Sequence, residues 1–212
     1  MITKYGYSTF AKVGALSLVL LVLAFALPLS LAMLSAGLGL FLIAFTLQFF
    51  RDPERTPPRI ERVILSPADG KIVLIKDTEH PFFNGAAKLV SIFMSPINVH
   101  VNRNPISGKV VHLRHIEGEY IAAFDHQSGE RNERTEIGIE NAHIKVFFKQ
   151  ISGYVARRII CELEANDTVK IGERFGMIKF GSRVDVFMPP EVKLCVREGE
   201  RVTAGETILA EY

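Results

Sequence analysis

The pattern of apolar and polar positions divides the chain near residue 50. The first 50 residues carry only two charged side chains, Lys4 and Lys12, and the run from 13 to 50 carries none. About 20 apolar residues suffice for a helix to cross a bilayer, whereas a secretory signal has an apolar core of about 7–15 residues. The run is therefore predicted to be a membrane anchor, with a cleaved signal as the less favoured alternative.

Pro28 interrupts this apolar run and predicts two helices, over 13–27 and 30–50. Lysines precede the run and arginines follow it. Because basic residues prefer the cytoplasmic side of a membrane, basic flanks at both ends favour a hairpin with both ends inside. We predict a membrane-embedded helical hairpin over 1–50, and a single bent span is the alternative.

The remainder of the chain has a different pattern. Residues 51–60 are polar and contain three prolines, which is typical of an extended linker. From 61 to 212, short runs rich in Val, Ile and Phe alternate with Gly, Pro, Asn and Asp, and such runs predict strands. The predicted strands are 71–75, 88–94, 109–113, 143–148, 178–180, 184–187 and 193–196.

One helical turn or short helix is expected over 154–161, and the turn spacing of 196–209 resembles that of lipoyl-like β folds. The fold class that follows is mainly β: a compact barrel or sandwich with lipoyl-like β elements and few short helices, preceded by the N-terminal hairpin. We expect three parts, the anchor at 1–50, the linker at 51–60 and a catalytic β domain at 61–212.

Charge and cysteine content exclude several classes. The net charge of +2 equals the two lysines of the first 50 residues, so the rest of the chain is neutral and has no field that would collect nucleic-acid phosphates. A hydrophobic content of 48% argues against disorder. Two cysteines cannot make a disulfide scaffold or a four-thiolate metal site, and the histidines have no metal-ligand spacing. We expect no metal and a reduced, cytosol-facing domain.

The segment 180–187, Phe-Gly-Ser-Arg-Val-Asp-Val-Phe, is the first candidate for chemistry. A Gly-Ser pair is common in turns, but apolar strand-like segments flank this one and would hold it rigidly. Attack of the Ser182 hydroxyl on the Gly181 carbonyl would give an ester. Elimination and hydrolysis would then leave a pyruvoyl group, an electron sink made from the chain itself.

Three further residues stand in segments that could carry chemistry. Asp69 lies in the turn 66–70, where the ordinary role of an Asp is to cap the turn. His100 lies in the alternating segment 94–105, where a lone histidine is more often structural. Arg103 has a planar fork suited to a carboxylate or phosphate, although a structural arginine is equally compatible with its position.

Taken together, the segments 66–70, 94–105, 130–134 and 180–187 resemble the short form of the phosphatidylserine decarboxylase family, of which archaetidylserine decarboxylase is a close variant. The resemblance extends over residues 51–212, with the apolar leader as the usual anchor. It implies self-cleavage between Gly181 and Ser182. The products would be a β chain of residues 1–181 and an α chain of residues 182–212 capped by pyruvoyl.

The resemblance also implies roles for the candidate residues. Asp69 aligns with the acidic member of the self-cleavage machinery, and His100 with a histidine that accepts the Ser182 proton and serves as acid–base in turnover. The long form of the family has a second histidine where this chain has Arg103. Either His100 does both tasks, or another histidine such as His115 supplies one. Arg103 is expected to bind substrate.

The implied reaction converts phosphatidylserine to phosphatidylethanolamine and CO2 through a Schiff base between the headgroup amine and the pyruvoyl ketone. The expected partners are a serine phospholipid, the cell membrane with the catalytic domain on its cytoplasmic side, and the two chains of one precursor; no nucleic acid is expected.

Three alternative functions remain. Archaetidylserine has the same serine headgroup as phosphatidylserine, so the motifs do not distinguish the two lipid substrates. A pyruvoyl enzyme that acts on a soluble amino acid would not need the membrane anchor. A membrane-tethered lipoyl-like carrier or adaptor lacks a recognisable modifiable lysine at a hairpin tip.

Overall fold

The computed structural model describes residues 1–119, 121, 131–153, 158–179 and 182–212. The chain forms two compact units, Met1–Glu54 and Arg55–Tyr212. The boundary between them lies inside the proline-containing segment 51–60.

The first unit is a pair of apolar helices, as predicted. A 3-10 turn at Lys4–Gly6 leads into α1 (Tyr7–Leu23), and α2 (Leu29–Phe49) begins directly after Pro28. Helix α1 starts six residues earlier than predicted. It includes Lys12, because lysine is a good helix former and a single charge does not end a helix.

Small residues bring the two helices together. The hydroxyl of Ser35 donates a hydrogen bond of 2.6 Å to the carbonyl of Leu20. A side chain at Gly39 would place its Cβ 3.1 Å from the carbonyl oxygen of Ser17, so glycine permits the close approach. Contacts of this kind are typical of helix pairs in membranes, where small residues let backbones pack closely.

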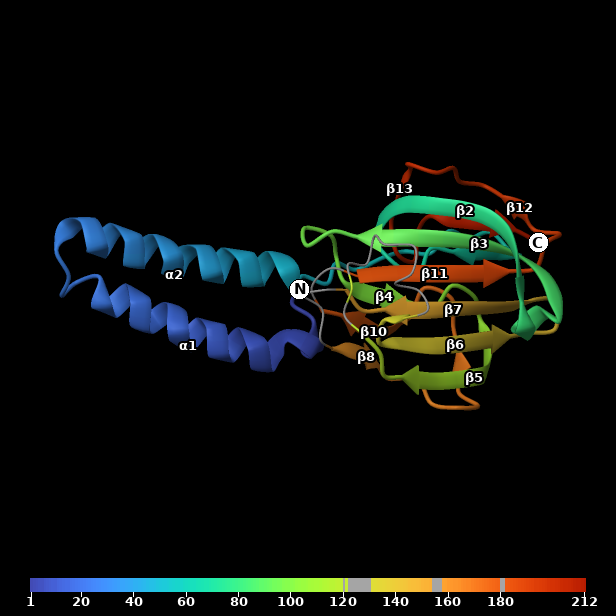
Figure 1. The fold of residues 1–212 in the computed structure, drawn as a ribbon, viewed down its shortest axis with the longest axis horizontal. Helices are drawn as coiled ribbons and strands as arrows, with labels where there is room; N and C mark the ends of the chain where they lie inside the picture. The colour runs from blue at the N-terminus through green and yellow to red at the C-terminus, as the bar shows by residue number, and fades with distance from the viewer. Residues whose placement is uncertain (120, 122–130, 154–157, 180–181) are drawn as a thin grey trace. The chain divides into compact units, whose positions relative to one another are not determined.

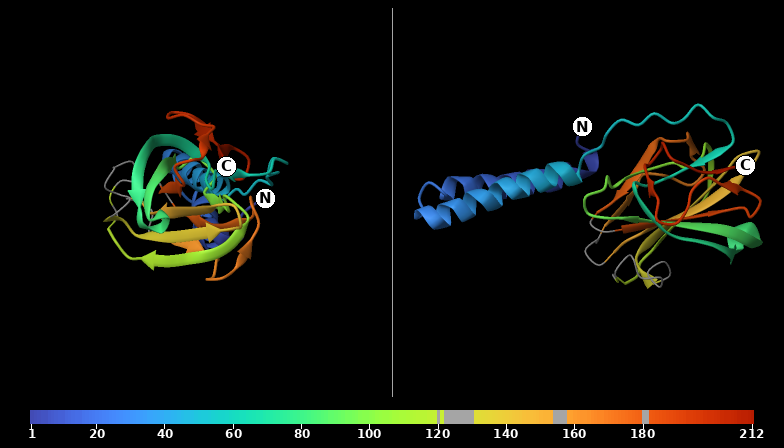
Figure 2. Two further views of the ribbon diagram at one scale, coloured as in Figure 1. Left: turned by 90° about the vertical axis from the view of Figure 1, so that its right-hand side faces the viewer. Right: turned by 90° about the horizontal axis from the view of Figure 1, so that it is seen from above.

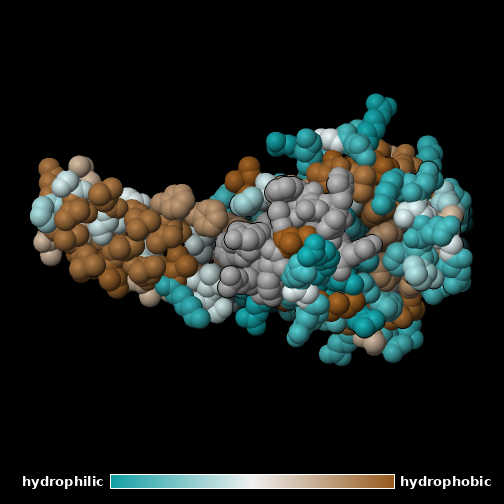
Figure 3. Space-filling view, in the orientation of Figure 1, coloured by the Kyte–Doolittle hydropathy of each residue, from teal (hydrophilic) through white to brown (hydrophobic). Residues whose placement is uncertain are grey.

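Both helices are long and apolar enough to cross a membrane by length and composition. Apolar side chains cover their surface, whereas the visible surface of the β unit is mostly hydrophilic (Figure 3). The ends of the pair are joined, because the backbone N–H of Thr3 donates to the carbonyl of Phe50 at 2.8 Å. This unit is therefore compatible with membrane association.

The secondary-structure elements of the second unit are nearly all strands (Figure 1). The strands are β1 (Val63–Leu65), β2 (Gly70–His80), β3 (Gly85–Met94), β4 (Val101–Arg103), β5 (Gly108–Ile116), β6 (Arg134–Glu140), β7 (Lys145–Ile151), β8 (Ile159–Cys161), β9 (Thr168–Val169), β10 (Arg174–Ile178), β11 (Ser182–Met188), β12 (Lys193–Leu194), β13 (Arg201–Val202) and β14 (Ile208–Glu211), with a 3-10 turn at Pro81–Phe83. The mainly β fold class is confirmed.

The strands form one large sheet and two small ones. The eight-stranded sheet has the order β13-β2-β3-β11-β7-β6-β5-β9, with antiparallel neighbours throughout. It curls, as Figure 2 shows. The three-stranded sheets have the orders β1-β14-β12 and β4-β10-β8. Strand β11 lies in the interior of the large sheet, between β3 and β7.

The two faces of the eight-stranded sheet are distinguished by the alternation along β11. Val184, Val186 and Met188 join the main hydrophobic core, and we call their side of the sheet the inner face. Phe187 belongs to a separate, smaller cluster on the opposite side, the outer face. Successive side chains of a strand point to opposite faces, so Ser182 faces inward with the core.

Two predicted elements differ from the structure. Ile159–Cys161 is strand β8 rather than helix, because consecutive β-branched isoleucines favour extended backbone and β10 offers it a pairing edge. The rest of that prediction, at 154–157, lies outside the described residues. Of the strand predicted over 178–180, Ile178 ends β10, Lys179 belongs to no strand, and residue 180 lies outside the described residues.

Candidate functional site

Ser182 begins β11 and is fully buried. It lies opposite Met94, the last residue of β3, and its Oγ donates a hydrogen bond to the Met94 sulfur at 3.3 Å. A thioether is a weak acceptor, so this contact places the hydroxyl without binding it strongly. Gly181, the other residue of the expected cleavage site, lies outside the described residues.

His100 is held by the turn that follows β3. Within that turn, the Asn98 side-chain oxygen accepts hydrogen bonds from the Ser95 backbone N–H at 2.9 Å and from the Ser95 hydroxyl at 2.6 Å. The Asn98 carbonyl then meets Nδ1 of the buried His100 at 2.9 Å. Because a carbonyl only accepts, Nδ1 carries the proton in the neutral ring and Nε2 is its basic nitrogen.

Contacts at the end of β3 link the predicted segments. The Asn102 side-chain amide donates to the carbonyl of Pro67 at 3.3 Å and lies 3.9 Å from the Met94 sulfur that also meets Ser182. Gln150 on β7 donates to the Asn102 side-chain oxygen at 2.9 Å. The structure thus joins the turn 66–70, the segment 94–105 and the start of β11 through one buried polar cluster.

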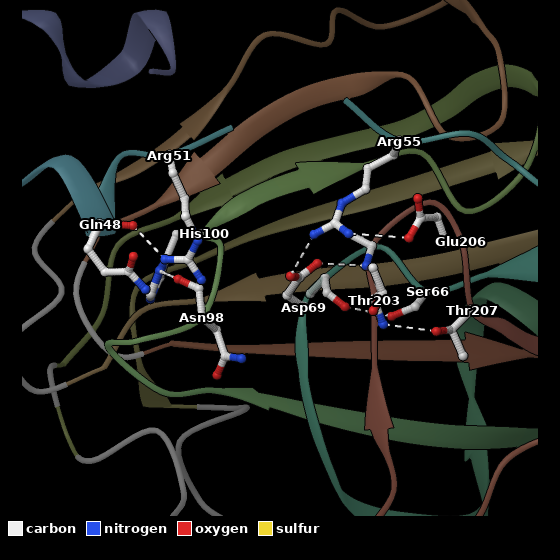
Figure 4. Close-up of polar contacts among 12 residues, drawn as sticks. Gln48, Arg51, Arg55, Ser66, Asp69, Asn98, His100, Thr203, Glu206 and Thr207 are labelled. Atoms are coloured by element: carbon white, nitrogen blue, oxygen red, sulfur yellow. Dashed lines mark hydrogen bonds and ion pairs between the residues drawn. The ribbon is translucent and has the colours of Figure 1, made fainter. Parts of the chain in front are cut away.

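Asp69 lies in the turn before β2, two residues after Pro67. Its carboxylate accepts a hydrogen bond from the Ala204 backbone N–H at 2.8 Å and pairs with Arg55 at 3.0 Å (Figure 4). Arg55 also pairs with Glu206 at 3.2 Å. These contacts join the turn to the C-terminal segment 203–207, and the role of Asp69 in self-cleavage stays a prediction.

Arg103 is buried at the end of β4. Its guanidinium donates to the carbonyl of Gly172 at 2.9 Å, and its backbone N–H donates to the carbonyl of Pro67 at 3.0 Å. These contacts tie β4 to two loops. Binding of substrate by Arg103 stays a prediction.

His115, the alternative histidine, lies on β5 with its side chain half exposed. Its Nδ1 is 3.1 Å from the Thr135 hydroxyl and its Nε2 is 3.5 Å from Glu133. The structure therefore places the His115 side chain beside Glu133 and Thr135 of the neighbouring segment, whereas His100 follows the strand that contacts Ser182.

Sequence reasoning missed three buried residues around the site, Met94, Asn102 and Asn132. Asn132 donates to the carbonyls of Ile121 and Ser152, each at 2.7 Å. Ser152 directly follows the residue of β7 that pairs with Arg183. The segment 130–134, of which the structure describes 131–134, thus supports the edge of the site. The sequence signal for this segment was that it is one of the four segments that carry the family resemblance.

No group of three or more His, Cys, Asp or Glu residues suited to a metal ion occurs among the described residues. Burial raises the pKa of the Cys161 thiol to about 11, so this cysteine stays protonated at neutral pH. The arrangement offers instead a buried hydroxyl, a buried imidazole and a network of amides that fixes the backbone between them.

Comparison with known proteins shows which family the chain resembles. The family model described as phosphatidylserine decarboxylase matches residues 42–210. Proteins named phosphatidylserine decarboxylase proenzyme are similar over the full chain. Those of Chlorobium chlorochromatii and Pelodictyon phaeoclathratiforme are 50% and 51% identical and aligned over 100% of both chains. That of Chlorobaculum tepidum is 47% identical over 99% of this chain and 97% of its own. This chain belongs to the phosphatidylserine decarboxylase family.

Proposed function

We propose that this protein is a membrane-attached proenzyme that cuts itself before Ser182 and then decarboxylates the serine headgroup of a phospholipid, with phosphatidylserine as substrate and phosphatidylethanolamine as product. The observation that carries the proposal is the burial of Ser182 at the start of a central strand, joined through Met94 to the turn that holds His100. Family membership and the names of the relatives support the same reaction class.

The self-cleavage uses the Ser182 hydroxyl as nucleophile and His100 Nε2 as the base that takes its proton. The oxygen adds to the Gly181 carbonyl, the peptide C–N bond breaks, and the amide nitrogen receives the proton, giving an ester. Loss of the Cα proton of residue 182 and breakage of its Cβ–Oγ bond release the Gly181 carboxylate and leave an enamine. Water then hydrolyses its imine tautomer, releasing ammonia.

The residues around Ser182 suit the group that this sequence of steps leaves. The new terminus would remain paired with Met94 on β3 and lie beside β7, in a site from which solvent is excluded. Pyruvoyl supplies an electron sink for loss of CO2 from an amino acid headgroup. His100, with Nδ1 fixed on the Asn98 carbonyl, can hold or deliver a proton at Nε2. We assign Asp69 to support of self-cleavage and Arg103 to substrate binding.

Attachment through α1 and α2 suits a lipid substrate, because it holds the enzyme at the surface where the headgroup is found. Basic residues on both sides of the helix pair favour the cytoplasmic side for the β unit.

The first test is the intact mass of the purified chain and of Ser182→Ala. The wild type should yield two fragments, 1–181 and 182–212, with pyruvoyl at the start of the smaller, and Ser182→Ala should remain one chain. Ser91→Ala is the matched control, since Ser91 is a buried serine on the neighbouring strand β3, and it should be cut normally. An uncut wild type in membranes that contain phosphatidylserine would refute the mechanism.

The side of the membrane can be read with Cys195, which is exposed. A membrane-impermeant maleimide should label it only after cells are lysed if the β unit is cytoplasmic. Cys161, with a pKa of about 11, should react slowly and serves as the internal reference. Equal labelling of intact and lysed cells would place the unit outside.

A further inference from the structure

The outer face of the eight-stranded sheet contains a cavity of about 580 Å³. Its lining comes from β2, β3, β5, β6, β7 and β11 and from the turn Pro81–Phe83. Strand β11 contributes Arg183, Asp185 and Phe187, which alternate with the inward side chains that begin at Ser182. The cavity therefore lies across the sheet from Ser182. Its volume is that of an ordinary small-ligand site.

The floor of this outer cavity is apolar and preformed. Leu89, Phe147 and Phe187 form a buried cluster there. Phe82 packs 5.3 Å from Phe147, measured between ring centroids. A Cβ at position 138 would lie 2.7 Å from the Phe82 ring, so Gly138 provides the space that this ring fills. Such a floor can receive the apolar part of a ligand without rearrangement.

Two of the three acidic side chains that line the cavity, Asp185 and Glu136, pair with basic neighbours, and the third, Glu79, is exposed. Both Asp185 oxygens accept from the Arg183 guanidinium, at 2.6 and 2.7 Å, with both side chains only 4% exposed. Glu136 accepts from Arg134 at 3.1 Å. The Lys149 ammonium lies farther from Glu136, at 3.8 Å, and sits over the apolar floor, 5.3 Å from the centroid of Phe187. The polar groups next to the apolar floor are therefore mainly hydrogen-bond donors.

His80 adds a neutral donor beside Lys149. Its ring lies 4.4 Å from Phe147 and 4.4 Å from Phe187, and its Nδ1 accepts the Phe82 backbone N–H at 3.2 Å, which leaves the proton on Nε2. Burial, and next the charge of Lys149, lower the pKa of His80 to about 4, and Glu136 opposes this less strongly. The His80 ring is therefore neutral at pH 7 and adds a hydrogen-bond donor without a charge.

We propose that the outer cavity binds a small anionic amphiphile, with its apolar group on Phe147 and Phe187 and its carboxylate or phosphate accepting hydrogen bonds from Lys149 and His80. The two halves of such a ligand match the two halves of the lining, an aromatic floor and adjacent donors. The site is separate from the chemistry at Ser182 and does not depend on it.

The test uses the full chain in phosphatidylcholine nanodiscs. The protein contains no tryptophan, so Thr78→Trp places a single fluorescent reporter at the cavity wall, where Thr78 is half-buried. Hexyl phosphate should change its emission in a saturable way, after subtraction of empty nanodiscs. Hexanol should bind more weakly, and inorganic phosphate should not bind. Calorimetric titration of the unmodified chain with hexyl phosphate checks that the reporter does not block the site.

Lys149→Met should weaken hexyl phosphate binding about 10- to 100-fold, since it removes a charged hydrogen-bond donor, and should leave hexanol unchanged. The matched control is Lys145→Met. Lys145 is on the same strand and lies 5.3 Å from the ring of Phe82, but it lines a neighbouring hollow. Its replacement should leave the affinity unchanged.

Several results would overturn this proposal. Absence of saturable binding in both assays would do so, as would equal losses in the two lysine variants. Equal binding of inorganic phosphate would show a simple anion site. A reporter already protected from iodide quenching without ligand, in a chain that is dimeric by mass photometry, would show that a second copy covers this face.

Discussion

The two faces of β11 bury polar side chains of different kinds. On the inner face, Ser182 stands at the head of an apolar row, and its hydroxyl meets only a weak acceptor in the contact to Met94. On the outer face, Arg183 and Asp185 form a buried charged fork with two short hydrogen bonds. The inner hydroxyl is held by one weak contact, and the outer pair is held by two short hydrogen bonds. One strand can have both environments because its side chains alternate between faces.

The comparison predicts that changes on the inner side affect processing while leaving the fold intact. We expect His100→Ala to slow self-cleavage by a factor of about 100 to 10,000, the usual contribution of a general base. Quantifying cut and uncut chain over time after synthesis measures this. His115→Ala is the control and should be cut at the wild-type rate. If His115→Ala is the slower variant, the base has been assigned to the wrong histidine.

Changes on the outer side should affect the fold more than the chemistry. Asp185→Leu leaves the Arg183 guanidinium buried without its carboxylate, and we expect it to lower the free energy of unfolding by about 3–5 kcal/mol. Denaturant unfolding of the β unit within the full chain measures the loss. The double variant Arg183→Met with Asp185→Leu should recover much of it, because it removes both charges. A double variant as unstable as the single one would contradict this explanation.

The smallest effect concerns pH. The pKa of His80 falls from 6.5 to about 4 in the folded protein, because burial and Lys149 disfavour its charged form. The unfolded chain therefore binds more protons between these values, and stability should decline as the pH falls from about 6.5 to about 4. His80→Phe should flatten this part of the profile, as measured by melting temperature against pH. An unchanged slope would exclude His80 as its source.

The sequence predicted the general organisation well. A charge-free run interrupted by Pro28 indicated two apolar helices, and alternating β-branched residues indicated most of the strands, because both signals are local. The segments that carry Asp69, His100 and Ser182 were also identifiable. The structure links these three segments through the contacts of Asn102 with Pro67 and Met94 and of Ser182 with Met94.

What could not be predicted depends on distant pairing. Ser182 and Met94 are 88 residues apart, and nothing local sets the register that places them opposite each other. The partner of His100 Nδ1 is a backbone carbonyl, which no residue type reveals. The outer cavity combines side chains from six strands, so it arises only when the sheet is assembled.

The strand order has a consequence for a chain cut before Ser182. The fragment 182–212 would contain β11 in the interior of the large sheet and β13 at its edge. It would also contain β12 and β14 of a small sheet, in which β14 lies between β12 and β1 of the larger fragment. Its strands pair with strands of the larger fragment in both sheets, so the two fragments share these sheets. Dilution would therefore not separate the two pieces, and they would not exchange with those of another molecule. The cut would create a new chain end while the protein remained a single folding unit.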